Sequence, residues 1–161
     1  MNSTGVRAPI HGLRRRARGL ALVEFALSVP VLLLLLFGTT EFTHFIIQYS
    51  ILNDAVRDSA RYVAAQALAG QSGVIVLSGT LITAGQNLVV YGNVAGTGPT
   101  LLPALATSQV TISADTVNSN ISVNAVYPYQ ALFAGSVPTF GFGSNIATAF
   151  NLSIATTMKA L

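Results

Sequence analysis

The stretch RRRARGLALVEFALSVPVLLLLLFG, residues 14 to 38, joins a cluster of arginines to an apolar run. From position 25 to position 47 the chain carries one carboxylate, Glu41, and is otherwise apolar or weakly polar. About 20 such residues are enough to span a bilayer as a helix, and a proline such as Pro30 is tolerated in membrane helices. The segment 20–47 is therefore predicted to cross a membrane once.

Basic residues are concentrated ahead of the apolar run. Five of the eight Lys and Arg residues precede Gly19, and after the run no basic residue occurs until Arg57. Positive charge flanking a span marks its cytoplasmic side. We therefore expect a single pass with the N-terminus inside and everything after about Thr43 outside.

The composition excludes several classes of protein. Of the 161 residues 52% are hydrophobic and only 8% are charged, whereas soluble domains carry roughly 25% charged residues. The net charge of +3 resides in the N-terminal arginines, which argues against nucleic-acid binding. The chain has no Cys, which excludes disulfides and thiolate metal sites.

A secretory signal peptide is one alternative for the N-terminal segment, because it also has a basic and an apolar part. The apolar run continues into FGTTEFTHF, residues 37 to 45, which lacks the small-x-small pattern of a signal peptidase site. An uncleaved signal anchor is the stronger alternative.

Glu24 is costly where it lies, at the start of a stretch otherwise suited to lipid. It follows Gly19 by five positions, so it can sit at the level of the cytoplasmic headgroups near Arg18. It can equally be a paired, functional carboxylate inside the membrane. The residues alone leave both interpretations open.

The local pattern RGLALVEF, residues 18 to 25, resembles the cleavage site of type IV prepilins. The longer stretches ALVEFALSVPVLLLLLFGTTEF and LNDAVRDSARYVA resemble the TadE-like proteins of tight-adherence (Flp) pilus systems, as do ISVNAVYPYQALF and the closing LSIATTMKA. The resemblance is specific over residues 14–65 and looser after that.

The resemblance implies that a prepilin peptidase cuts after Gly19 and leaves Leu20 as the new N-terminus. Glu24 then becomes the fifth residue and pairs with the new α-amine of a neighbouring subunit, which sets the register of assembly. Leu20 departs from the Phe that many type IV pilins have at this position. The leader, residues 1–19, carries Arg14, Arg15, Arg16 and Arg18 immediately before the cut.

The implied partners are the prepilin peptidase, other pilin or pseudopilin subunits, the inner-membrane assembly platform and the lipid bilayer. The implied location is the bacterial inner membrane, with the C-terminal domain extracytoplasmic. The sequence leaves open whether the mature protein enters the fibre or stays at its base. No cofactor and no metal site are expected.

Helical periodicity continues beyond the predicted span, with apolar residues at three- and four-residue steps. We expect one helix from Leu20 to Ala69, which Gly70 and Gly73 stop. The amphipathic outer segment is assigned to residues 48–70. The stripe consists of Phe42, Phe45, Ile46, Tyr49, Leu52, Val56, Ala60 and Val63.

The remaining chain is predicted to form a small α+β domain of pilin-like type. Residues 71–108 are ambiguous and could form a second helix or short strands. We favour a helix from about Leu77 to Tyr91 that lies on the first helix, followed by a Gly/Pro loop. Residues 109–161 alternate with period two in three stretches, which predicts a three-stranded antiparallel sheet on the outer half of the long helix. In the loop AGSVPTFGFGSN we expect Phe140 and Phe142 to cover this sheet.

No enzymatic constellation is present. The two histidines, His11 and His44, lie in the basic tail and near the outer membrane edge, and no nucleophile or phosphate-loop motif occurs. The leading hypothesis is therefore a structural minor pilin or pseudopilin of a Flp/Tad-type pilus. The alternative is an uncleaved single-pass membrane protein with an extracytoplasmic binding domain.

Overall fold

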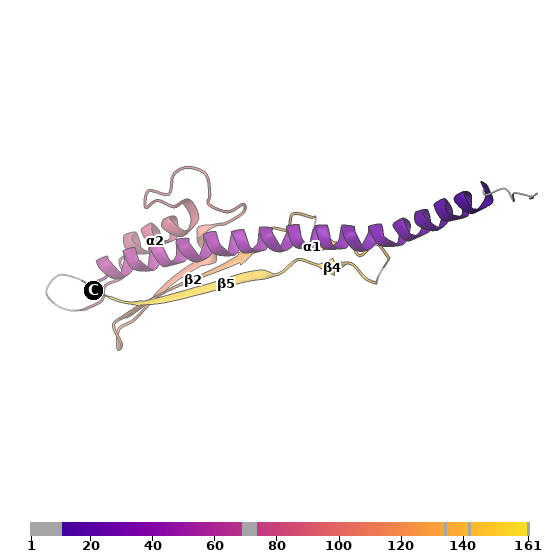
Figure 1. Ribbon diagram of the computed structural model, residues 1–161. Coiled ribbons are helices and arrows are strands. Elements are labelled where there is room, and N and C mark those ends of the chain that lie inside the picture. Colours follow the sequence, from indigo (N-terminus) through magenta and orange to yellow (C-terminus); the bar gives the residue numbers. More distant parts are fainter. Residues whose placement is uncertain (1–10, 69–73, 134, 142, 161) are drawn as a thin grey trace, which may run out of the picture.

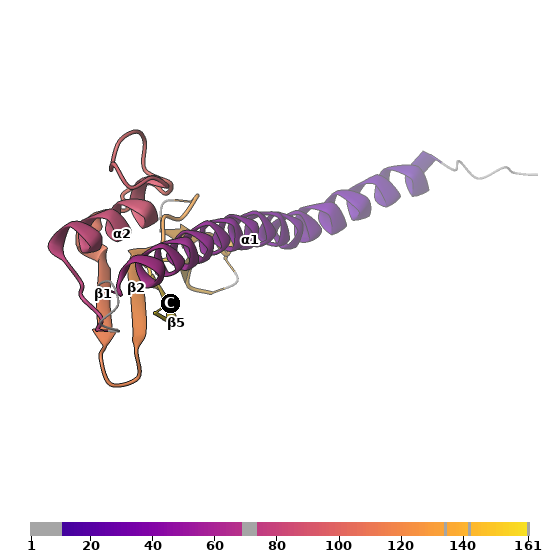
Figure 2. The ribbon, with the colours of Figure 1, turned by 90° about the vertical axis from the view of Figure 1, so that its left-hand side faces the viewer.

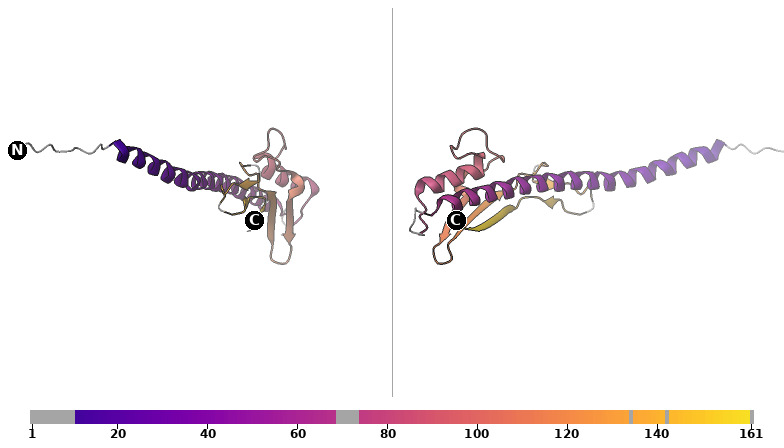
Figure 3. Two further views of the ribbon diagram at one scale, coloured as in Figure 1. Left: turned by 90° about the vertical axis from the view of Figure 1, so that its right-hand side faces the viewer. Right: turned by 60° about the vertical axis from the view of Figure 1, so that its left-hand side comes forward.

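The computed structural model describes residues 11–68, 74–133, 135–141 and 143–160, with side chains from residue 19 onward. The dominant element is the helix α1, His11–Gln66, which is 56 residues long, about 84 Å at 1.5 Å per residue. Pro30 lies inside it. Its N-terminal part extends away from the rest of the molecule, while its C-terminal half carries the folded domain (Figures 1 and 3). The predicted α+β architecture is confirmed.

The bounds of α1 differ from the predicted Leu20 to Ala69 at both ends. At the start, the helix includes the arginine-rich turns from His11, where Arg and Ala are good helix formers. At the end, the backbone N–H of Val76 donates to the carbonyl of Ala67 at 2.8 Å, and Leu68 forms a β-bridge with Ile75. This return pairing ends the helix, and the predicted stop residues Gly70 and Gly73 lie outside the described residues.

The predicted apolar stripe of α1 is confirmed only in its C-terminal half, where Leu52, Val56, Ala60 and Val63 are fully buried. Nearer the membrane segment, Phe42, Ile46 and Tyr49 are exposed, so this part of the prediction is wrong. There the covering elements contact the polar residues Glu41 and Gln48 instead, which are 7 positions apart and thus share one helix face.

The predicted second helix is confirmed as α2, Gly79–Tyr91. Ser78 caps its start by accepting a hydrogen bond from the N–H of Leu81, and Gly92 ends it in the left-handed region at φ 70°. Such a cap favours Gly because a Cβ is strained there. The α2 helix lies along α1, as expected, and buries Leu81, Gly85, Val89 and Val90.

The three-stranded antiparallel sheet is also confirmed. Its strands are β1 (Val110–Asp115), β2 (Asn120–Pro128) and β5 (Asn151–Lys159), and their order in the sheet is β1-β2-β5. The two helices cover one face of it, with α2 over β1 and α1 over β2 and β5 (Figure 2). The alternating apolar residues that predicted the strands are the ones buried against the helices. The opposite face carries hydroxyl and amide side chains, for example Ser122 and Thr157, whose oxygens lie 2.9 Å apart.

A short 3-10 turn, Thr107–Gln109, leads into β1. The region between β2 and β5, predicted as a loop, contains a second, two-stranded ribbon formed by β3, Ser136–Val137, and β4, Ile146–Ala147. Strands of two residues leave no periodicity to detect, which explains the omission.

The predicted placement of Phe140 over the main sheet is wrong, because its ring stacks on Phe37 of α1 with a centroid distance of 5.8 Å. Phe142 lies outside the described residues. Phe133 contacts the same Phe37 ring edge-on at 4.8 Å. The region between β2 and β5 therefore packs along α1, toward its exposed N-terminal part.

Candidate functional site

The N-terminal part of α1 has the properties of a membrane anchor. An 18-residue window within Gly19–Gln66 has a mean hydropathy of 2.6, and none of that window is buried within the protein. Leu20, Leu22, Phe25 and Leu27 are each between 66% and 71% exposed. So much apolar surface is stable only in an apolar medium or against another protein.

The predicted processing and registration residues lie on this exposed segment. A Cβ added at Gly19 would meet nothing within 4 Å, so the fold itself does not require glycine there. Leu20 and Glu24 are exposed on the same helix. The four leader arginines lie in the first turns of α1, and their side chains are outside the described part of the chain.

A second acidic site, which sequence reasoning did not assign, lies where the folded domain begins. Glu41 is only 6% exposed. Its Oε1 accepts a hydrogen bond from the hydroxyl of Tyr129 at 2.6 Å. Its two carboxylate oxygens lie 3.3 and 3.2 Å from the backbone N–H of Leu132, which donates to them. The negative charge is thus held by two donors from the segment after β2.

Two helical turns further along α1, Gln48 forms hydrogen bonds with the same segment. Its Nε2 donates to the carbonyl of Gln130 at 2.8 Å, and its Oε1 accepts from the N–H of Gln130 at 3.3 Å. The Gln48 Nε2 also lies 2.6 Å from His44 Nε2, which must therefore be the accepting ring nitrogen. We call Glu41, Gln48, Tyr129, Gln130 and Leu132 the clasp.

Aromatic packing closes the clasp on one side. The Tyr129 ring stacks on Phe150 at 4.9 Å and meets Phe45 edge-on at 5.9 Å. Burial, the hydrogen bond to Glu41 and the charge of that carboxylate raise the pKa of the Tyr129 phenol well above its ordinary value of 10. The phenol therefore stays protonated and remains a donor to Glu41.

The signal for the clasp was present in the sequence but incomplete. A lone carboxylate in an apolar run, such as Glu41, calls for a partner. That partner is 88 positions away in the chain, at Tyr129. Sequence periodicity describes contacts within one element and so cannot identify it.

Concave surfaces lie beside α1 in the described part of the chain. An apolar groove of about 390 Å³ lies beside the clasp, between α1 at Leu34 and Gly38 and the β3–β4 region at Val137 and Ile146.

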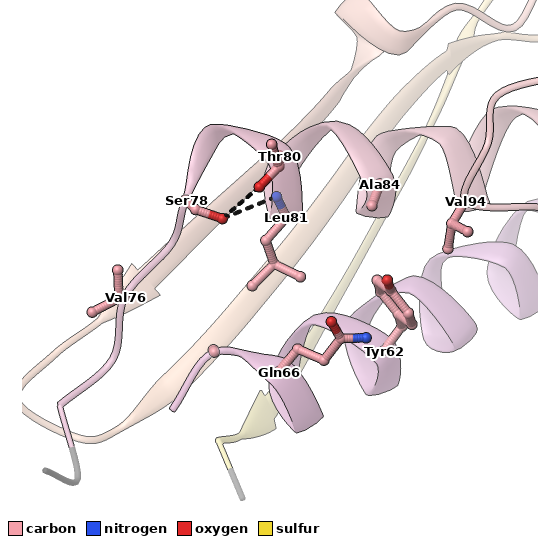
Figure 4. Close-up of a pocket in the computed structure, with 9 residues that line it drawn as sticks. Tyr62, Gln66, Val76, Ser78, Thr80, Leu81, Ala84 and Val94 are labelled. Carbon is pink, nitrogen blue, oxygen red and sulfur yellow. Dashed lines mark hydrogen bonds between the residues drawn. The ribbon is translucent and has the colours of Figure 1, made fainter. Parts of the chain in front are cut away.

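A cleft of about 500 Å³ lies between the last turns of α1 and the first turns of α2. Tyr62 and Gln66 of α1 line one side of this cleft and Leu81 and Ala84 of α2 the other (Figure 4). Within the described residues, no group of three or more His, Asp or Glu side chains is arranged to hold a metal ion.

These features define an α+β protein with one membrane-anchor-like helix and no described metal centre. Residues 19–61 match the family described as TadE-like protein, so the resemblance drawn from the sequence is confirmed over this segment. The match spans 43 of the 161 residues and shows similarity to this family over that part of the chain. It covers α1 from the predicted cut site through Glu24, Glu41 and Gln48. Comparisons with curated proteins and with solved structures give no match.

Proposed function

We propose that this protein is a minor pilin or pseudopilin of a Flp/Tad-type pilus, inserted in the bacterial inner membrane and cut by a prepilin peptidase after Gly19. The observation that carries the proposal is the TadE-like match, which begins at residue 19. The exposed apolar half of α1 supplies the surface by which such subunits are held in the membrane or against one another.

The local chemistry at the proposed cut supports it. Glycine inside a helix costs about 1 kcal/mol relative to alanine, so α1 is easier to open at Gly19 than at a neighbouring alanine or leucine. With no Cβ there, a peptidase can approach the backbone closely. The space around Gly19 is open, so the requirement for glycine comes from the enzyme and not from packing.

Cleavage gives Glu24 a partner. It creates an α-amine on Leu20 with an ordinary pKa near 8, which is largely protonated at neutral pH. A carboxylate buried with a cation costs far less than one buried alone. The amine of one subunit and Glu24 of the next then fix the axial register of two packed α1 helices.

The sharpest test combines mass spectrometry with a glycine variant. The membrane-extracted protein is expected to begin at Leu20, and Gly19→Val is expected to retain the leader while inserting normally. Gly38→Val is the matched control, because Gly38 is also a helical glycine with nothing within 4 Å of an added Cβ. Its leader should be removed as in the wild type.

Other N-termini point to other functions. A chain that still begins at Met1 supports an uncleaved anchor with an extracytoplasmic binding domain, for which the cleft between α1 and α2 is the available site. A start beyond Phe37 supports a secreted protein. Normal shortening of Gly19→Val would refute cleavage at this bond.

A further inference from the structure

The distance between the two acidic residues of α1 limits where the membrane can lie. Glu24 and Glu41 are 17 positions apart, about 26 Å along a helix rising 1.5 Å per residue. The hydrocarbon core of a bilayer is about 30 Å thick. A core that starts at Glu24 therefore ends beyond Glu41, and one that starts at Leu20 ends near Thr40.

The folded domain already covers α1 at those levels. The Phe37 ring contacts Phe133 and Phe140 at 4.8 and 5.8 Å, and the apolar groove extends back to Leu34. The region between β2 and β5, with β4 in it, lies beside the middle of α1 and nearer its free end than α2 does (Figure 1). Whether the hydrocarbon core starts at Leu20 or at Glu24, this region therefore reaches the outer surface of the membrane.

The surface of this region suits lipid. Residues 131–150 contain no Asp, Glu, Lys or Arg. Four of their large apolar side chains are between 40% and 55% exposed although the domain is otherwise folded: Leu132, Phe140, Ile146 and Phe150. Ile146 and Phe150 line the apolar groove, and Leu132 lies beside Thr39 and Thr43 of α1 at a similar level. Exposed apolar side chains around one end of a domain mark an interaction surface.

Several polar groups at the same level are satisfied from within, although the buried Oγ1 of Thr148, which lines the groove, has no hydrogen-bond partner. The Glu41 charge is covered by Tyr129 and the N–H of Leu132. On α1, the hydroxyls of Thr39 and Thr43 donate to the helix carbonyls four residues earlier, each at 2.8 Å. Because these hydroxyls already have acceptors, their desolvation opposes contact with acyl chains less than that of free hydroxyls would.

We propose that Leu132, Phe140, Ile146 and Phe150 form a membrane-docking rim, in which these four side chains enter the outer interface of the bilayer and the apolar groove takes acyl-chain ends. The occupant of this face is the lipid in which α1 is anchored, because the surface is continuous with the span. The inference rests on the anchoring in the proposed function, but not on cleavage or pilus assembly. It means that the domain is held against the membrane and does not swing freely on its helix.

The absence of Cys from the chain allows a direct test. In four variants of the full-length protein, a single cysteine replaces Leu132, Ile146, Val117 or Leu27. Each variant is labelled at its cysteine with environment-sensitive nitrobenzoxadiazole and reconstituted in vesicles of phosphatidylethanolamine and phosphatidylglycerol. Val117 is the matched control, being an exposed apolar residue (88%) in the β1–β2 connection. Leu27 reports the anchor itself.

Replacing part of the lipid with brominated phosphatidylcholine should quench the labels at Leu132, Ile146 and Leu27 and leave the label at Val117 bright. If Leu27 is quenched while Leu132 and Ile146 behave like Val117, the rim does not exist and the anchor stands. If Leu27 also escapes quenching, the anchor and the rim both fail. Shielding at Leu132 and Ile146 that appears only at high protein density, without lipid quenching, would assign this face to a second copy and overturn the proposal.

Discussion

The carboxylate of Glu41 is buried where α1 leaves its exposed apolar part, and two donors replace the water it has lost. The donors come from positions 129 and 132, so the interaction fixes the start of the β2–β5 region on α1. Gln48 repeats this two turns later through a backbone-like pair with Gln130. Single polar residues thus set the height at which the domain sits on its helix.

Glu41→Ala should release this region, because the Leu132 N–H loses its acceptor and the Tyr129 hydroxyl keeps only the backbone carbonyl of residue 41, at 3.2 Å. A buried polar group left unpaired costs about 1–3 kcal/mol. We expect faster chymotrypsin cleavage within residues 131–150, measured on the full-length protein in detergent, since proteolysis follows local opening. Glu41→Gln keeps an acceptor oxygen and should be cleaved at nearly the wild-type rate. Equal rates for Glu41→Ala and wild type would show that the clasp does not hold the region.

At the scale of the elements, α1 and α2 approach each other closely at Gly85. The Ser59 hydroxyl donates to the Gly85 carbonyl at 2.8 Å. A Cβ at Gly85 would lie 2.6 Å from Ile112 Cδ1 and 2.7 Å from Val63 Cγ2. Glycine at this point lets α2 lie against α1 and β1 together.

Gly85→Val should therefore push α2 off its neighbours and destabilise the domain by about 1–3 kcal/mol, as overpacking of cores does. The measurement is urea unfolding of the full-length protein in detergent, followed by circular dichroism. Gly79→Val makes the same change at the start of α2, where an added Cβ meets nothing within 4 Å. Similar losses in the two variants would contradict the packing argument.

Sequence reasoning succeeded at this scale where an element has one buried face. Val110, Ile121, Val123 and Ile154 alternate with polar residues because one side of the sheet meets the helices, and so the strands were predictable. The β3–β4 ribbon is too short to carry a period. The exposed Phe42 broke the expected helical stripe because apolar residues of an anchor need not face the protein's own core.

At the scale of the whole molecule, α1 is one continuous helix with two environments. Its free half exposes an apolar surface, and its other half belongs to the core of the domain. The family match and the exposed span were both predictable from residues 14–65, whereas the height of the domain on α1 depended on long-range contacts that only the fold reveals.

Assembly should depend on the charge of Glu24. Glu24→Gln preserves shape but removes the partner of the proposed α-amine, so pilus formation should fall while processing and membrane insertion continue. Ser28→Ala, one turn away, removes only a hydroxyl bound to the helix carbonyl of residue 24 and serves as the control. Surface pili are measured by shearing and immunoblotting, and wild-type amounts in Glu24→Gln would exclude the pairing.

The arginines ahead of Gly19 give the chain an electrostatic character that a chain cut after Gly19 would lack. The chain has a formal net charge of +3, and removal of Arg7, Arg14, Arg15, Arg16 and Arg18 leaves −2. Anionic headgroups on the inner leaflet attract each such arginine by about 1 kcal/mol. If the cut falls after Gly19, it reverses the sign of the protein and releases it from that leaflet's surface potential, a change that isoelectric focusing would register as a shift from basic to acidic.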